Sequence, residues 1–214
     1  MDLSSINPAI LVASVMVAAT PILLAGIGEL VVEKSGVLNL GVEGMMIIGA
    51  VVGFMAAVAA GQPWLGFAAA LLAGAALALV FGVLTQVCLA NQVASGLGLT
   101  LFGLGLSALL GQGSIGVRPP RMDPLEVPVL ADLPFVGEAF FRHSPMVYVA
   151  LLLVLAVALF LRNSRLGLML RAVGENHDAA HGLGYPVVAI RMAAIAFGGA
   201  CAGRAGLGRG PGRG

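Results

Sequence analysis

Long apolar segments follow one another along most of this chain, and they restrict its fold more than any other feature. Runs dominated by Leu, Ala, Val and Gly cover residues 9–28, 42–60, 64–88, 93–112, 145–161 and 187–207. A helix needs about 20 apolar residues to cross a hydrocarbon core that is roughly 30 Å thick. A membrane-spanning β-barrel would show short alternating segments instead. The sequence therefore predicts an all-α fold, a polytopic transmembrane helix bundle with about six spans.

The charge content agrees with a chain surrounded by a lipid bilayer. Hydrophobic residues make up 59% of the 214 residues and charged residues only 10%, against about 25% charged residues in soluble domains. The net charge of +1 gives no support to nucleic-acid binding. Cys88 and Cys201 both lie within apolar runs, so we expect packing residues and no disulfide framework.

Small residues recur at every fourth position in four of the runs. The positions are Gly49, Gly53, Ala57 and Gly61; Gly66, Ala70, Gly74, Ala78 and Gly82; Gly103, Ser107 and Gly111; and Ala194, Gly198, Ala202 and Gly206. Residues four apart share a helix face, and a face without large side chains lets two helix backbones approach closely. The stripes predict a compact bundle, although Gly and Ala are also simply common in membrane spans.

Two polar stretches interrupt the apolar runs. Residues 113–144 combine five prolines with seven charged residues, which predicts an external loop. In residues 163–186, apolar positions recur at helical spacing and charges fall between them, which predicts one amphipathic helix ended by Gly184 and Pro186. A solvated connecting helix and a helix that docks on a soluble partner are both compatible with this pattern.

The orientation follows from the Lys and Arg residues of the connections. Six spans place residues 29–40, 89–92 and 162–186 on one side, and this side carries Lys34 and the arginines of the third connection. We expect it to be cytoplasmic, with the N-terminus outside. Arg204, Arg209 and Arg213 near the C-terminus contradict this asymmetry.

Polar residues between the first two runs are the first candidates for a solute path. Asn39 and Glu43 lie four residues apart, among Gly36, Gly41 and Gly44, and would share one helix face. A charge at mid-membrane costs about 2.5–3.5 kcal/mol on insertion scales, so it is retained for a partner or a pathway. Glu43 at the membrane interface is the alternative. Asn91 and Gln92 are further path candidates. Gln86 and Thr100 could also hydrogen-bond a solute, and each of these polar groups could instead bind helices to one another.

Motifs for catalysis or nucleotide binding are missing from the sequence. A P-loop requires G-x-x-x-x-G-K-[ST], and the single lysine, Lys34, follows Glu33. His177 and His181 share a helical face, but no third metal ligand accompanies them. We therefore expect a transport subunit that is not an enzyme, with no catalytic residues, no metal and no cofactor.

Three segments together resemble one family. SGVLNLGVEGMM at 35–46, ANQVASGLGLTLFGLGLS at 90–107 and LGLMLRAVGENHDAAHGLGY at 166–185 are similar, in this order, to permeases of ATP-binding-cassette importers. That family serves simple sugars, nucleosides and branched-chain amino acids, and the second segment is most similar to its nucleoside and simple-sugar branch. The resemblance covers about residues 8–203.

The resemblance implies a set of partners and a location. The partners are an ATP-binding subunit that hydrolyses ATP, a second permease subunit, and an extracellular substrate-binding protein or lipoprotein; the location is the bacterial inner membrane. It also implies a cytoplasmic coupling helix that contacts the ATPase through Glu175, Asn176, Ala179, Ala180 and Gly184, with Arg171 one turn before Glu175. The family usually has proline where His177 stands and an acid where His181 stands, which changes the charge of this contact.

The C-terminal end departs from the family, whose members continue with further spans. Residues 208–214 form a Gly/Arg-rich tail that cannot span a membrane. We expect an incomplete permease domain over residues 1–207, from a truncated or frame-shifted chain; a natural short variant is the alternative. For function, the alternatives to an importer of a nucleoside or simple sugar are a branched-chain amino acid importer, a secondary transporter driven by an ion gradient, and an inactive membrane subunit.

Overall fold

The computed structural model describes residues 8–114, 116–117, 125–126, 142–143 and 145–205. The long helices within them are α1 (Pro8–Lys34), α2 (Val42–Ala60), α3 (Pro63–Gly82), α4 (Gln92–Gly111), α6 (Pro145–Asn163) and α9 (Val187–Ala205). The shorter elements are the π-helix η2 (Val83–Val87), the 3-10 turn η3 (Gln112–Ser114), the helices α7 (Arg165–Glu175) and α8 (His177–Gly182), and the paired strands β1 (Leu125–Glu126) and β2 (Arg142–His143).

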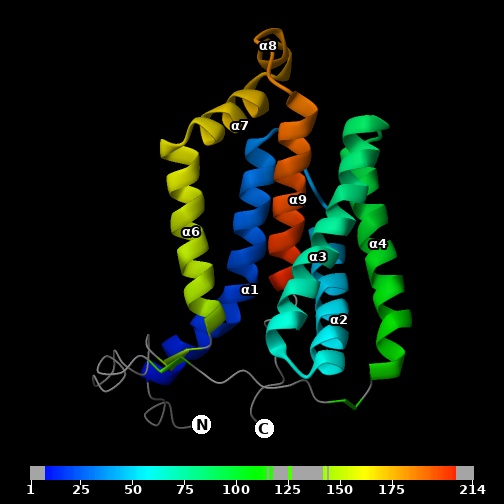
Figure 1. The fold of residues 1–214 in the computed structure, drawn as a ribbon, viewed down its shortest axis with the longest axis vertical. Helices are drawn as coiled ribbons and strands as arrows, with labels where there is room; N and C mark the ends of the chain where they lie inside the picture. The colour runs from blue at the N-terminus through cyan, green and yellow to red at the C-terminus, as the bar shows by residue number, and fades with distance from the viewer. Residues whose placement is uncertain (1–7, 115, 118–124, 127–141, 144, 206–214) are drawn as a thin grey trace.

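Within the described residues, six helices are long and apolar enough to cross a membrane. They run alternately up and down, so that the connections 35–41, 88–91 and 164–186 meet at one end of the bundle (Figure 1). The predicted all-α polytopic bundle is confirmed, and the chain is a multi-pass membrane protein. Most of the predicted external loop at 113–144, and the tail at 208–214, lie outside the described residues.

Helix α9 is the centre of the bundle and packs on α1, α2 and α3. Small residues allow the close approach: a Cβ atom on Gly74 of α3 would lie 2.7 Å from the Cα atom of Gly203, and one on Gly28 of α1 would lie 2.9 Å from the carbonyl oxygen of Gly198. A Cβ atom on Gly49 of α2 would likewise clash with the backbone of Gly203. The predicted stripes on these helices therefore lie in helix–helix contacts.

Two members of the predicted stripes do not pack in this way. Gly61 lies beyond the end of α2 with a φ of 65°, where it terminates the helix in a left-handed conformation. A Cβ atom on Gly61 or on Gly111 would meet no atom within 4 Å. Sequence spacing identified the stripes correctly and overestimated their length at these two ends.

Larger side chains fill the space where α9, α1, α2 and α3 diverge. Phe81, Met45 and Ile195 are completely buried there, together with Val32 and Val37. Burial of one such side chain contributes about 1.5–3 kcal/mol in water; inside a membrane, the tight fit between neighbouring atoms contributes more than the removal from water.

Helix α6 stands apart from this core. It packs on α1 and α7, and a cavity of about 400 Å³ separates its face from α9. Apolar side chains of α1, α6, α7 and α9 line the cavity, among them Val157, Met169, Ala193 and Phe197. Helix α7 crosses the end of the bundle from the end of α6 toward α9 (Figure 1) and closes this cavity on that side.

The amphipathic helix expected over 163–186 is two helices. α7 ends at Glu175 and α8 begins at His177, because Asn176 adopts an extended conformation with φ −152° and ψ 99°. The side chain of Asn176 then accepts a hydrogen bond from the backbone N–H of Ala179 at 3.0 Å and caps α8. Asparagine competes with helical hydrogen bonds in this way, which periodicity alone does not reveal.

Candidate functional site: a polar cavity and the α7–α8 segment

The end of α1 is fixed by a glycine in the left-handed conformation. Gly36 has a φ of 82°, its N–H donates to the carbonyl oxygen of Glu33 at 2.9 Å, and the N–H of Val37 donates to that of Val32 at 3.4 Å. This pair of bonds is a Schellman motif, in which a residue after the helix packs on the last turn. Val32 and Val37 are both buried in the core, so the chain turns back toward the bundle interior.

Residues 37–41 then descend into the bundle without forming a helix. Their backbone groups find partners on two helices, α1 and α4: the N–H of Leu38 donates to Gln92 Oε1 at 2.8 Å, that of Asn39 to Glu29 Oε1 at 3.2 Å, and Thr100 Oγ1 donates to the carbonyl oxygen of Leu40 at 3.0 Å. Irregular backbone at membrane depth is tolerated where protein groups satisfy it or where it lines a cavity.

The depth of this segment follows from its neighbours. Glu29 precedes the last residue of α1 by five positions, or about 7.5 Å along a helix. Gly44 lies against the carbonyl oxygen of Leu99, which a Cβ atom on Gly44 would approach to 2.8 Å. Leu99 is seven residues into α4, about 10 Å from its start. Helix α2 therefore begins inside the bundle, and Glu43, in its first turn, lies below the helix ends.

A cavity of about 540 Å³ opens beside this segment. Helices α1, α2 and α4 and residues 39–40 form its walls. Its lining is mostly apolar, with polar groups from Glu29, Asn39, Glu43 and Thr100. None of its lining residues is Lys, Arg or His. The cavity thus offers hydrogen-bond acceptors, a hydroxyl and an amide within apolar walls, as many small-molecule sites do.

Asn39 holds the turn into α2. Its Oδ1 accepts a hydrogen bond from the N–H of Gly41 at 3.0 Å, and the side chain is buried. The structure contradicts the expectation that Asn39 and Glu43 share a helix face, because α2 begins only at Val42. The two residues nevertheless line the same cavity.

The other two path candidates lie elsewhere. Asn91 caps α4 by accepting a hydrogen bond from the N–H of Ala94 at 3.1 Å, and Gln92 holds the backbone of Leu38. Neither lines the 540 Å³ cavity. Glu29 does, although the sequence motifs did not select it for the path. The sequence signal was its position, an acidic residue near the end of a long apolar run.

The two carboxylate oxygens of Glu29 differ in their hydrogen bonding. Oε1 accepts the N–H of Asn39, whereas Oε2 is buried with no hydrogen-bond partner among the described residues. A buried acceptor without a partner costs about 1–3 kcal/mol. Such a group is typical of a site whose partner arrives with a ligand or with another conformation.

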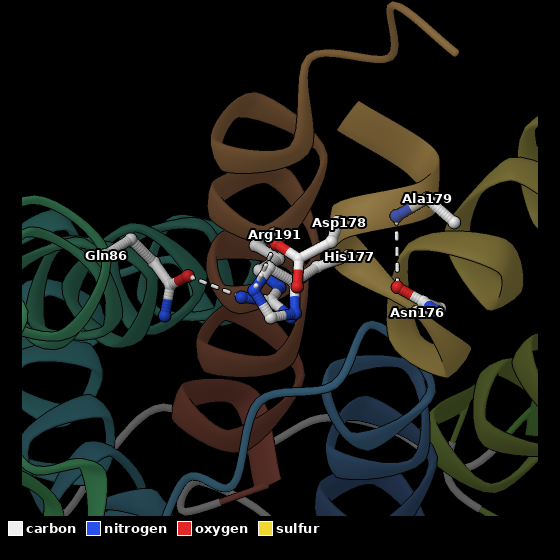
Figure 2. A network of polar contacts seen from close by, with 6 residues as sticks. All are labelled: Gln86, Asn176, His177, Asp178, Ala179 and Arg191. Carbon is white, nitrogen blue, oxygen red and sulfur yellow. Dashed lines mark hydrogen bonds and ion pairs between the residues drawn. The ribbon is translucent and has the colours of Figure 1, made fainter. Parts of the chain in front are cut away.

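At the end of the bundle, α7 and α8 present the residues that the family resemblance assigned to coupling. Arg171, Glu175, Asn176, Ala179 and Gly184 are exposed, whereas Ala180 is 3% exposed and packs inside the chain. Figure 2 shows Asn176 facing the N–H of Ala179 and His177 beside Asp178, with a distance of 3.3 Å from Nε2 to Oδ1. The assignment of these residues to an ATPase contact stays a prediction.

Gly184 closes α8 with the geometry that Gly36 gives to α1. Its φ is 84°, its N–H donates to the carbonyl oxygen of His181 at 2.9 Å, and the N–H of Tyr185 donates to that of Ala180 at 3.1 Å. Only glycine adopts this conformation without strain. The chain then enters α9, so α8 connects α7 to α9 at the end of the bundle.

Comparisons with known proteins place the chain in a family. The sequence profile described as "Branched-chain amino acid transport system / permease component" matches residues 11–208. A putative glucose ABC transporter permease protein of Haloferax volcanii is 48% identical over 193 residues, which are 88% of this chain and 59% of that protein. A guanosine ABC transporter permease protein of Bacillus subtilis is 31% identical over 89% of this chain and 63% of its own length.

A nucleoside ABC transporter permease protein of Lactococcus lactis is 32% identical, over 91% of this chain and 65% of that protein. The chain thus spans about three fifths of the length of the curated relatives it matches. No solved structure shows a significant match. The profile match over most of the chain and these identities show that the chain belongs to the family of branched-chain amino acid transport system permease components.

Proposed function

We propose that this chain is the membrane-spanning permease of an ATP-binding-cassette importer and carries a sugar or a nucleoside across the bacterial inner membrane. The observation that supports the activity is the family match over residues 11–208, with relatives named as glucose, guanosine and nucleoside permeases. The polar cavity beside residues 37–41 supports the location of the solute path. Residues 1–207 supply this permease domain, with 113–144 outside and 163–186 in the cytoplasm.

The chemistry of the cavity favours a neutral solute with hydroxyl groups. Carboxylate oxygens of Glu29 and Glu43 and the side-chain oxygens of Asn39 and Thr100 can accept hydrogen bonds from hydroxyls. An amino acid would bring an ammonium group, which these acids could bind, but also a carboxylate, for which the lining residues offer no cation. A sugar or nucleoside needs only hydrogen-bonding partners of the kind that the cavity offers, so it fits better than a branched-chain amino acid.

The segment α7–α8 is proposed to bind the ATP-binding subunit. It lies at the end of the bundle where α1 ends and α9 begins (Figure 1), and it exposes Arg171, Glu175, Asn176, Ala179 and Gly184. The buried Ala180 would support this surface from inside the chain. ATP hydrolysis then occurs on that separate subunit. On this proposal, Gln92 belongs to the path as a support of the segment that carries Asn39, and Asn91 caps the helix end from which Gln92 extends.

Two further partners complete the transporter. A second permease subunit is proposed to pack on an apolar outer face of the bundle, for example that of α4, where Leu97, Leu101 and Phe102 are exposed. A substrate-binding protein or lipoprotein would deliver the solute at the opposite end from α7–α8.

Uptake into proteoliposomes tests the proposed function. The protein is purified with its ATP-binding subunit and solute-binding partner, and radiolabelled glucose, guanosine or leucine is supplied with ATP inside or outside the vesicles. We expect ATP-dependent accumulation of glucose or guanosine, reduced about tenfold or more by Glu43→Leu and unaffected by the matched change Glu33→Leu, because both carboxylates are exposed but only Glu43 lines the cavity.

Three results would contradict the proposal. Uptake of leucine alone would assign the chain to amino acid transport, and uptake that follows an ion gradient without ATP would indicate a secondary transporter. Normal uptake by the Glu43→Leu variant would remove the cavity from the path.

A further inference from the structure

Residues 35–41 touch both parts of the proposed mechanism. At one end, Gly36 lies against α7: a Cβ atom on Gly36 would lie 3.1 Å from the Cα atom of Gly174, and one on Gly174 would lie 3.1 Å from the backbone nitrogen of Gly36 and would clash with the carbonyl oxygen of Lys34. At the other end, Asn39 and Leu40 line the polar cavity. The same short segment therefore connects the α7 backbone with the cavity wall.

Gly174 of α7 and Gly36 carry no side chains that could absorb a movement at their contact. Gly174 and Gly36 meet through backbone atoms, and the Schellman bonds of Gly36 and Val37 fix the turn to the end of α1. Packed backbones transmit displacement because the interior of a protein is close-packed and hardly compressible. A shift of α7 must therefore either move residues 35–37 or separate from them.

Arg191 contacts the same segment from helix α9. It lies in the first turns of α9, and its Nε donates to the carbonyl oxygen of Ser35 at 3.1 Å, while its Nη1 donates to Gln86 Oε1 at 3.5 Å (Figure 2). A Cβ atom on Gly36 would lie 3.1 Å from Nη2. One guanidinium thus contacts the segment 35–41 from α9 and also the π-helix η2, an element that often marks functional positions in helices.

The strength of this contact suits a reversible link. The guanidinium is partly buried, and its positive charge lies at the C-terminal end of α1, where the helix dipole favours a cation. Both acceptors are neutral oxygens, and such bonds are weaker than an arginine–carboxylate pair. The link can therefore hold the segment in one state and release it in another.

We propose that Arg191 is a positioning residue that holds residues 35–41 between α7 and the cavity, so that displacement of α7–α8 by the ATPase shifts Asn39 and Leu40. This inference rests on the proposed function and adds to it a specific route between the two sites. It also assigns a role to Gln92 and Glu29, which hold the far end of the segment through Leu38 and Asn39.

The first test measures solute uptake per ATP hydrolysed in the complete transporter. Arg191→Gln removes the positive charge and leaves one side-chain nitrogen as a hydrogen-bond donor in place of three. We expect ATP hydrolysis within twofold of the wild type and uptake per ATP reduced tenfold or more. Arg191→Lys keeps the charge but presents a single nitrogen, which cannot reach two acceptors in the same fork geometry, so we expect an intermediate ratio. Arg162→Gln is the matched control, because Arg162 is exposed at the same end of the bundle.

A second test does not depend on transport. Backbone hydrogen exchange of residues 38–41 is measured in the purified transporter without nucleotide, and we expect Arg191→Gln to accelerate it about tenfold while Arg162→Gln leaves it unchanged. A merely structural role would lower thermal stability and reduce uptake and hydrolysis in proportion.

The outcomes separate the two proposals. Unchanged exchange at residues 38–41, or uptake and hydrolysis that fall together in Arg191→Gln, would overturn the role of Arg191 and leave the importer assignment intact. A wild-type transporter without ATP-driven uptake would refute the proposed function, and the coupling route would be refuted with it. Accelerated exchange together with a lowered uptake ratio supports both.

Discussion

The two sides of helix α1 differ in how they are packed. On one side, α1 packs on α9 through small residues, with Gly28 of α1 against Gly198 of α9, and α9 packs in turn on α2 and α3. On the other side, α6 leans on α1 through ordinary side chains, and a cavity of about 400 Å³ separates α6 from α9. We call the first group of helices (α1, α2, α3 and α9) the core bundle and the second (α6, α7 and α8) the arm.

This difference indicates which part of the molecule can move. Backbone-to-backbone contacts lose their van der Waals energy after small shifts, so the core bundle has one favourable arrangement. The arm meets the core bundle backbone to backbone at Gly174, beside the end of α1. Its other contacts are fewer and it borders an open apolar cavity, so small displacements of α6 and α7 cost less. The proposed ATPase contact lies on the arm, and the polar cavity lies against α1, α2 and α4 beside the core bundle.

The largest expected effect comes from a methyl group inside the core bundle. A Cβ atom on Gly199 would lie 2.5 Å from the carbonyl oxygen of Gly74 and would clash with Ala78. We expect Gly199→Ala to destabilise the protein by about 3 kcal/mol or more, because overpacking against backbone cannot be relieved by rotating a side chain. Thermal unfolding in nanodiscs measures the change.

The matched control is Gly105→Ala on α4, where a Cβ atom would meet nothing within 4 Å. Alanine favours a helix over glycine by about 1 kcal/mol in water, so this variant should be as stable as the wild type or more so. Equal losses in the two variants would show that the close contacts of the core bundle do not determine its rigidity.

The next effect concerns the boundary between the core bundle and the cavity. Glu29→Leu removes the acceptor of the Asn39 N–H, leaving a backbone donor unpaired inside the protein. We expect a loss of about 1–3 kcal/mol, measured by thermal unfolding. Glu29→Gln keeps a carbonyl oxygen at the same place and should retain most of the stability. If both variants unfold at the wild-type temperature, the hydrogen bond does not hold the segment 37–41.

The sequence predicted the spans well and their irregular ends poorly. The run at 42–60 coincides with α2, and that at 93–112 with α4 to within one residue, because hydrophobic length is a property of each segment alone. The π-helix at 83–87 and the break at Asn176 depend on hydrogen bonds that compete with the helical pattern. Hydrophobic periodicity carries no information about that competition.

The candidate site was predicted in part, for a related reason. Asn39 and Glu43 stood out as polar residues among glycines, and both line the cavity. Glu29 reaches it from α1, and Thr100, which the sequence also offered as a hydrogen-bonding candidate, reaches it from α4, far away in the sequence. Their convergence depends on how three helices pack. Asn91 looked equivalent to Asn39 in the sequence, yet its side chain caps α4, since the choice between capping and lining a path is made by the local backbone.

A smaller effect distinguishes two asparagine caps that make the same kind of hydrogen bond. Asn176 caps α8 on the arm, and Asn91 caps α4, each accepting from the N–H three residues ahead at 3.0 and 3.1 Å respectively. Loss of a cap costs about 1 kcal/mol. α8 spans only His177–Gly182 and has few other bonds, so we expect Asn176→Ala to accelerate hydrogen exchange throughout α8, while Asn91→Ala affects only the first turn of α4.

Asp also caps helices well, so Asn176→Asp should restore slow exchange. Equal, local effects of the two alanine variants would mean that α8 is held by its contacts with α7 and α9, and that the arm is stiffer than its packing indicates.

The smallest expected effect uses one helix with two different faces. Ala193 and Ala202 both lie on α9; Ala193 is exposed and lines the 400 Å³ cavity beside the arm, whereas Ala202 is 0% exposed in the core bundle. Ala193→Leu adds apolar volume to open space, so we expect a change in stability of less than about 0.5 kcal/mol, as at surface positions without special contacts. The same change at Ala202 should cost several times more, since no space exists for the added atoms. Thermal unfolding of the two variants under identical conditions compares the faces directly. If Ala193→Leu destabilises as much as Ala202→Leu, then α6 and α7 are packed against α9 as tightly as α3 is, and the arm has no freedom to carry a movement from the ATPase to Arg191.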